Sequence, residues 1–110
     1  EDIQKYAVLN MAEVMPEYPH GADSLLNYLK NEIRYPKKAQ KKGIEGRVYV
    51  QFVVEKDGSI TNAKVAQGLE PGLDRNALET VKNMKKWIPG KQLGQPVRVK
   101  LILPFDYRLM

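Results

Sequence analysis

Residues 47–65, Arg-Val-Tyr-Val-Gln-Phe-Val-Val-Glu-Lys-Asp-Gly-Ser-Ile-Thr-Asn-Ala-Lys-Val, decide the fold of this chain. In residues 47–54 apolar side chains recur at every second position, the spacing that places them on one face of a β-strand. The other face is partly apolar as well, so we expect this strand in the middle of a sheet. Lys56-Asp57-Gly58 has the composition of a turn, and residues 60–65 are expected to return as the second strand of a hairpin.

Two amphipathic helices flank this hairpin in the sequence. Residues 22–34 carry apolar side chains three and four positions apart, which predicts a helix with one apolar stripe. Tyr35-Pro36 ends it, because the residue before a proline is pushed out of the helical region. Residues 37–42 are expected to add one further turn. Pro71-Gly72 breaks the chain before a second predicted helix, at about residues 73–86.

Residues 97–105 alternate again and predict a last strand. The crossover through the second helix makes this strand parallel to residues 60–65, and therefore antiparallel to residues 47–55. The expected sheet order is second, first, last, with the last strand on an edge, where Pro104 is tolerated. The predicted fold class is α+β, a small antiparallel sheet with two helices packed on one face.

The length of 110 residues suits one small domain. We expect a leading arm or short strand in residues 1–15 and one domain in residues 16–110. The chain begins on Glu1 without a methionine, which indicates a fragment of a longer protein. Its apolar runs are far shorter than the roughly 20 residues of a spanning helix, so no transmembrane segment is predicted.

The residues that carry catalysis in most enzymes are scarce. The chain has no cysteine and one histidine, His20, which lies between Pro19 and Gly21 in an expected turn. It offers no glycine-rich phosphate loop, no metal-ligand cluster and no paired acid and base. We therefore predict no enzymatic activity, no catalytic or metal site and no cofactor.

A set of spaced motifs resembles the TonB C-terminal domain family. In order, they are Tyr35-Pro36, Ala39-Gln40, Gly43-Ile44-Glu45-Gly46, a valine-rich strand, Lys56-Asp57-Gly58, Lys85-Lys86-Trp87, Pro89-Gly90-Lys91 and a final alternating strand. The resemblance covers roughly residues 16–108. Met15-Pro16-Glu17-Tyr18-Pro19 and the first helix look like the form common in the Bacteroidetes, and the first helix and leading strand are additions to the minimal family core.

The resemblance implies a periplasmic energy-transducing adaptor, anchored to the inner membrane in the full-length protein. Its amino-terminal part, missing here, would partner the proton-driven ExbB/ExbD motor. The domain would bind the TonB box, a short extended peptide of outer-membrane transporters, by strand addition to its last strand, and transmit force. The expected peptide-binding residues are Tyr35, Pro36, Val97, Arg98, Val99, Lys100, Leu101, Ile102 and Leu103.

Three questions stay open at this point. The same fold serves as a periplasmic sensory or interaction domain on other membrane proteins, such as a membrane-bound peptidase-like signal receptor. The net charge of +5 and two lysine clusters also leave a nucleic-acid-binding module, although no aromatic ladder supports it and no nucleic-acid partner is expected. An open sheet edge allows a homodimer, and the leading arm is a candidate to cover that edge.

Overall fold

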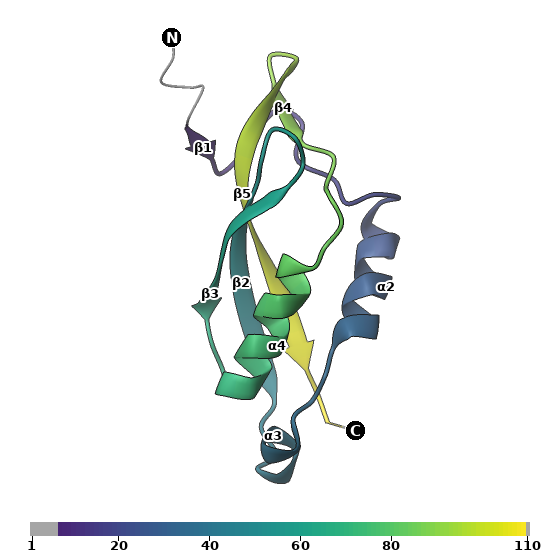
Figure 1. Ribbon diagram of the computed structural model, residues 1–110, viewed down its shortest axis with the longest axis vertical. Coiled ribbons are helices and arrows are strands. Elements are labelled where there is room, and N and C mark those ends of the chain that lie inside the picture. Colours follow the sequence, from purple (N-terminus) through teal and green to yellow (C-terminus); the bar gives the residue numbers. More distant parts are fainter. Residues whose placement is uncertain (1–6, 110) are drawn as a thin grey trace.

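The computed structural model describes residues 7–109 of the chain. In chain order its elements are β1 (Val8–Leu9), α2 (Ala22–Glu32), α3 (Lys37–Lys41), β2 (Gly46–Val54), β3 (Ile60–Gln67), α4 (Pro71–Lys82), β4 (Gly90–Gln92) and β5 (Gln95–Tyr107). The molecule is elongated, 54 × 27 × 18 Å, and α3 lies at the end opposite to β4 (Figure 1). The predicted α+β class is confirmed.

The sheet has the strand order β1-β5-β2-β3, with β4 paired to β5 outside this path. β2 is antiparallel to both β3 and β5, so the predicted order of second, first and last strand is confirmed. The register joins Val54 to Val99 at one end of the β2–β5 pair and Gly46 to Tyr107 at the other. β5 therefore forms the central length of the molecule, and β1 is added to it in parallel.

The helix α4 begins and ends earlier than the sequence predicts. It starts at Pro71 instead of residue 73, because proline suits the first helical position and Glu70 caps the helix by accepting a hydrogen bond from the Leu73 N–H at 2.9 Å. It ends at Lys82 instead of residue 86. Met84 and Trp87 continue the helical spacing of apolar residues but are buried from the following loop.

The hairpin of β4 and β5 was not predicted from the sequence. Gly90, Lys91 and Gln92 pair with Val97, Pro96 and Gln95, and the two-residue turn between them is Leu93-Gly94. Both turn residues have positive φ, 52° and 74°, as the tight hairpin turns that match strand twist require. A strand of three residues is too short to show an alternating pattern.

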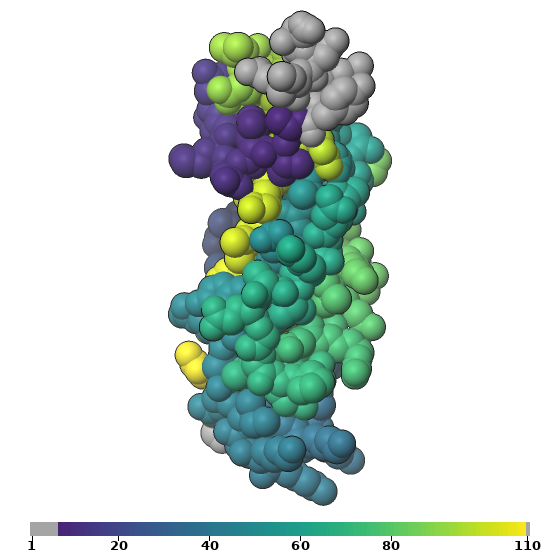
Figure 2. All heavy atoms as spheres, turned by 90° about the vertical axis from the view of Figure 1, so that its left-hand side faces the viewer, coloured from purple at the N-terminus to yellow at the C-terminus, as the bar shows by residue number. Residues whose placement is uncertain are grey.

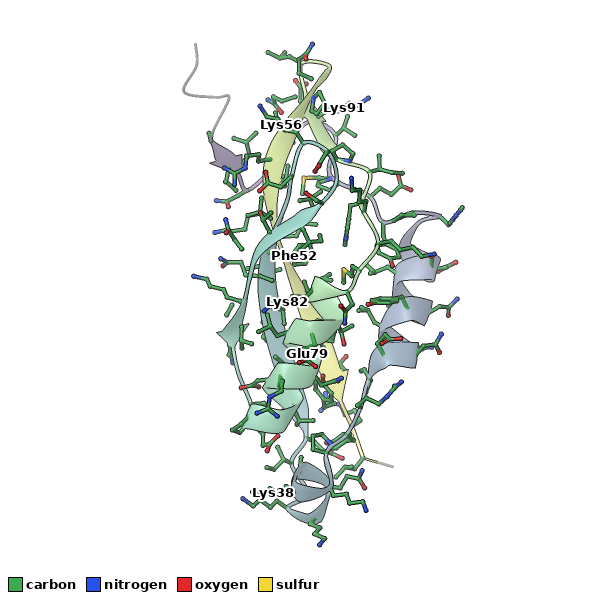
Figure 3. The ribbon with its side chains drawn as sticks, in the orientation of Figure 1. Lys38, Phe52, Lys56, Glu79, Lys82 and Lys91 are labelled. Carbon is green, nitrogen blue, oxygen red and sulfur yellow. The ribbon has the colours of Figure 1, made fainter. Side chains whose placement is uncertain are left out.

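The core lies between the inner face of the sheet and the helices. Its largest fully buried side chains come from β2, α4 and β5, and Figure 3 shows Phe52 pointing into this space. They are Tyr107, Phe52, Phe105, Leu73, Val48, Val50, Val54, Val81 and Val99. Trp87 packs against Tyr18 and Phe52, with ring centroids 5.4 and 5.6 Å apart. Trp87 therefore belongs to the core.

Helix α2 lies beside α4, on the side of the molecule away from β3 (Figure 1). The Tyr28 hydroxyl donates a hydrogen bond to the Thr80 carbonyl at 2.8 Å, which joins the two helices. Asn76 of α4 donates to the Glu32 carbonyl at 3.1 Å and accepts from the Arg34 N–H at 3.0 Å. The carboxyl end of α2 is therefore fixed to α4 by hydrogen bonds between the Asn76 side chain and the backbone of Glu32 and Arg34.

Candidate functional site

Within residues 7–109 the sheet has two long unpaired edges, the outer edge of β3 and part of the outer edge of β5; the second is the one that the sequence predicts as a site. β2 pairs with one edge of β5 from Val99 to Tyr107. On the other edge β1 pairs only with Arg98 and Val99. Within residues 7–109 no strand pairs with the remaining length of this edge, and we call its stretch from Lys100 to Tyr107 the open edge. Unpaired strand backbone of this length can accept an added strand.

The predicted site residues on β5 fall into two groups. Val97 belongs to the β4–β5 hairpin, and Arg98 and Val99 are covered by β1. Figure 2 shows the leading segment over the upper part of β5, with atoms of β5 exposed below it. Lys100, Leu101, Ile102 and Leu103 lie on the open edge. The leading arm therefore covers the upper part of the predicted site and leaves its lower part accessible.

The side chains of β5 alternate as the sequence predicts. Val99 and Phe105 are buried on the inner face, and Leu101 and Leu103 are partly buried there. Ile102 is on the outer face and is 50% exposed. A strand added to the open edge would meet apolar side chains on its inner side and Ile102 on its outer side.

Arg98 is held by a carboxylate from the neighbouring strand pair. Its guanidinium donates to both oxygens of Glu55, at 2.7 and 3.0 Å, and the Thr61 hydroxyl donates to the same carboxylate. The hydrogen bonds from Arg98 lower the pKa of Glu55, and those to Glu55 raise the pKa of Arg98. The pair stabilises the junction of β2 and β5 beside β1.

Tyr35 and Pro36 are not on the open edge. The Tyr35 hydroxyl donates to the Ile44 carbonyl, and its ring lies edge-on to that of Tyr107 with centroids 5.8 Å apart. Burial raises the pKa of both tyrosine hydroxyls. Tyr107 in turn donates to the Asn76 side chain at 2.7 Å. These contacts make Tyr35 a link between the α2–α3 connection and the carboxyl end of β5.

An apolar groove runs between α2 and the lower part of β5. It has a volume of about 270 Å³ and is lined by Leu26, Leu29, Lys30, Ile33, Pro104, Phe105 and Asp106. We call it the α2–β5 groove. The sequence predicts Leu26 on the apolar stripe of its helix, but the side chain is 54% exposed beside this groove. The groove therefore extends the open edge with an apolar wall.

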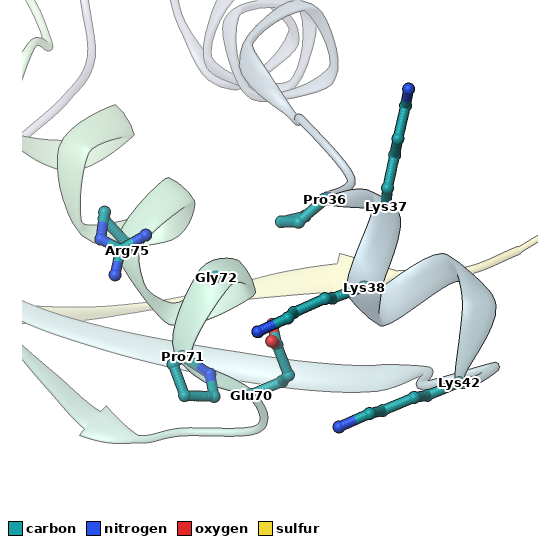
Figure 4. Close-up of a pocket in the computed structure, with 8 residues that line it drawn as sticks. All are labelled: Pro36, Lys37, Lys38, Lys42, Glu70, Pro71, Gly72 and Arg75. Carbon is teal, nitrogen blue, oxygen red and sulfur yellow. The ribbon is translucent and has the colours of Figure 1, made fainter.

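A basic pocket lies at the α3 end of the molecule (Figure 4). It has a volume of about 590 Å³, and its lining is Pro36, Lys37, Lys38, Lys42, Glu70, Pro71, Gly72 and Arg75. Glu70 is already engaged as the cap of α4. Three of the lysines at residues 37–42 thus line one pocket together with Arg75 and Glu70, at the end of the molecule opposite to β4.

The described residues include neither a metal-ligand group nor a helix able to span a membrane. Within residues 7–109 no group of three or more His, Cys, Asp or Glu side chains is placed to hold a metal ion. None of the helices in this range has the length and apolar character needed to cross a bilayer. His20 is exposed in the turn before α2, as expected.

Sequence reasoning missed the lower third of this surface. Pro104, Phe105 and Asp106 continue the open edge beyond the predicted range, because β5 runs to Tyr107. The alternation of buried Phe105 and Tyr107 is visible in the sequence and marks this extension. The sequence contains one indication that α2 contributes to this surface, which is Leu26. Whether Leu26 packs in the core or lines the groove depends on where α2 lies, and the sequence does not give that position.

Comparison with known proteins agrees with this geometry. Residues 31–109 match the family described as Gram-negative bacterial TonB protein C-terminal. Two proteins named Protein TonB, from Helicobacter pylori strains ATCC 700392 / 26695 and J99, are 37% and 40% identical over 82 residues. These matches cover 74% of this chain but only 27% and 28% of the relatives, so the chain spans about a quarter of their length.

Solved structures show the same fold. The solution structure of the Helicobacter pylori TonB C-terminal domain is similar with a TM-score of 0.58 and 32% identity, over 84% of this chain and 87% of that one. The Pseudomonas aeruginosa TonB C-terminal domain is similar with a TM-score of 0.52 and 23% identity, over 94% and 96%. The resemblance carried by the spaced motifs is confirmed: the chain belongs to the Gram-negative bacterial TonB protein C-terminal family.

Proposed function

We propose that this domain is the periplasmic peptide-binding part of a TonB-type energy transducer, an adaptor without enzymatic activity. It binds the TonB box of outer-membrane transporters as an added strand along β5. The proposed contacts on the open edge are Lys100, Leu101, Ile102 and Leu103. Val97, Arg98 and Val99 extend the contact where the peptide displaces β1, and Tyr35 and Pro36, which lie off this edge, contribute through the packing of Tyr35 on Tyr107 at its lower end. The open edge carries the proposal, because its backbone groups face no strand of the described chain.

Backbone pairing suits a partner that serves several transporters. Each hydrogen bond to an added strand contributes a net of about 0.5–1.5 kcal/mol and depends little on the side chains that carry it. In the full-length protein, an inner-membrane anchor and the ExbB/ExbD motor would supply the force that the bound strand transmits. The family membership supports this role, since TonB proteins transduce energy for transport.

Titration with transporter peptides tests the proposal. Isotope-labelled chain is mixed with amino-terminal peptides of outer-membrane transporters from the same organism, and backbone amide shifts are followed. The largest shifts are expected along β5 between Val97 and Tyr107. A scrambled peptide of the same composition is the control. Shifts confined to the basic pocket or to β3, with none on β5, would contradict strand addition.

Two proline variants separate the edges of β5. Neighbouring strand residues direct their N–H groups to opposite edges, so of Leu101→Pro and Ile102→Pro one removes a donor from the open edge and the other from the β2 side. The variant that removes a donor from the open edge should weaken peptide binding with a small loss of stability. The variant that removes a donor from the β2 side should mainly destabilise the fold. Equal loss of binding in both, at equal stability, would contradict the proposal.

A further inference from the structure

We propose that α2 and the open edge form one slot, in which an added strand inserts a branched aliphatic or aromatic side chain into the α2–β5 groove, beside Phe105. The inference rests on the proposed strand addition and specifies which peptides that site selects. The backbone of β5 would supply attachment, and α2 would supply the choice among strands.

Helix α2 is amphipathic but incompletely covered. None of its 11 residues is buried, although Leu25 and Leu29 pack against the core. Leu26, on the same apolar side, is 54% exposed. A surface helix normally covers its apolar stripe, so the outer part of this stripe lacks a partner within the described chain.

The uncovered part of α2 lies beside the lower part of the open edge, across the α2–β5 groove. The α2–β5 groove has Leu26, Leu29 and Ile33 on one side and Phe105 with its neighbours on the other. An added strand places alternate side chains on the inner face of the sheet, at the level of Phe105. The side chain opposite Phe105 would therefore enter the groove from the vacant strand position.

The size and lining of the groove define the class of side chain. Its volume is about 270 Å³, whereas one water molecule occupies about 30 Å³ of liquid. A methyl group would leave most of this space unfilled, and a leucine, isoleucine or phenylalanine side chain would fill much more of it. Lys30 is the cation at the rim, while Asp106 is already paired with Arg47 at 2.7 Å.

The wall of the slot is fixed before any strand arrives. Tyr28 bonds to the Thr80 carbonyl, and Asn76 bonds to both the Glu32 carbonyl and the Arg34 N–H. A pre-formed site binds more tightly than one that must be ordered on binding. A strand can fill the apolar groove with a side chain and also form hydrogen bonds with the unpaired backbone of β5. A helix in the same place would leave those backbone groups unpaired.

A double-mutant cycle between chain and peptide tests the inference. The peptide that gives the largest β5 shifts is made as a series with each residue replaced by alanine, and dissociation constants are measured with the 110-residue chain and with Leu26→Ala. One alternate position should lose about tenfold in affinity on replacement. Leu26→Ala should weaken the parent peptide several-fold but that alanine peptide hardly at all, since both changes empty the same space.

The controls isolate the groove from general effects. Leu26 is half exposed, so its replacement leaves the core intact. Leu69→Ala removes a partly exposed leucine near β3, at the opposite edge of the sheet, and should leave every peptide unchanged. Leu26→Trp should fill the groove, so that it weakens the parent peptide more than the alanine peptide.

Each outcome has one meaning. Peptides that shift β5 but bind Leu26→Ala and Leu26→Trp as tightly as the parent chain overturn the slot and leave strand addition standing. Peptides that shift no β5 residue overturn both. A chain whose mass doubles with concentration, and whose groove residues shift with that change and not with peptide, has a second copy in the slot, which also overturns the inference.

Discussion

The guanidinium of Arg98 and the carboxylate of Glu55 form a two-point ion pair, with hydrogen bonds of 2.7 and 3.0 Å, where β2 ends beside β5. Both side chains are about one-quarter exposed or less. The pair therefore lies between a screened surface contact and a buried one, and its energy should be measurable.

Glu55→Gln is expected to reduce the free energy of unfolding by about 1 kcal/mol at pH 7. The pKa of Glu55 in the fold is below its ordinary value of 4.5. Its contribution is therefore complete above about pH 4.5 and is lost as the pH falls through the lowered pKa. Urea unfolding at pH 7 and below pH 4 should show the variant and parent converging in acid. Asp106→Asn, at a half-exposed pair, is the control with little effect.

Gly58→Ala should destabilise the domain by about 2–4 kcal/mol, because two costs combine. Gly58 has a φ of 89°, and an added Cβ would lie 2.0 Å from the Trp87 carbonyl oxygen. Gly94→Ala is the matched control, since its φ is 74° but the space around it is open. It should cost only about 1 kcal/mol. Equal thermal-unfolding losses in the two variants would show that the contact with Trp87 has no effect.

Asn76→Ala is expected to cost about 2–3 kcal/mol in denaturant unfolding. The amide side chain joins three elements: it bonds to the Glu32 carbonyl, the Arg34 N–H and the Tyr107 hydroxyl. Hydrogen exchange should rise in the last turn of α2 before it rises in β2. Asn83→Ala, at the end of the same helix, has an exposed side chain and should leave α2 unchanged.

Shortening the chain to begin at Met11 removes β1 and lengthens the open edge by Arg98 and Val99. A transporter peptide long enough to pair with both should then bind about fivefold tighter, from roughly 1 kcal/mol of added backbone pairing. A shorter peptide that reaches only Lys100 should be unaffected. If both peptides gain affinity equally, the removal of β1 changes the whole domain and not only the pairing of Arg98 and Val99.

The sequence predicts the long elements well because each repeats its pattern over several turns or pleats. β2, β3, β5 and α2 were recognised in this way, and the crossover rule gave their order. β1, which the sequence predicts only as an arm or short strand within residues 1–15, and β4, which it does not predict, have two and three residues, too few for a period, and each pairs with β5. The sequence predicts too late an end for α4 because Met84 keeps the helical spacing while it packs from the following loop.

The surface beside β5 was predicted only in part. Alternation and Pro104 indicate a strand at an edge, which needs no tertiary information. The share of the edge that β1 covers, and the position of α2 over the remainder, depend on contacts between residues far apart in sequence, such as Tyr28 with Thr80. Leu26 looks like a core residue in the sequence, and only the placement of α2 leaves it exposed.

The unequal occupation of the two edges of β5 has a mechanical consequence. β2 pairs with it along all nine of its residues, from Gly46 to Val54, and is held by the chain at both of its ends, while a guest on the open edge would be held by strand pairing alone. Under tension along the strands, the contact that has no covalent link to the domain separates first. A guest strand would thus be released while the domain keeps its shape, ready for another cycle of attachment.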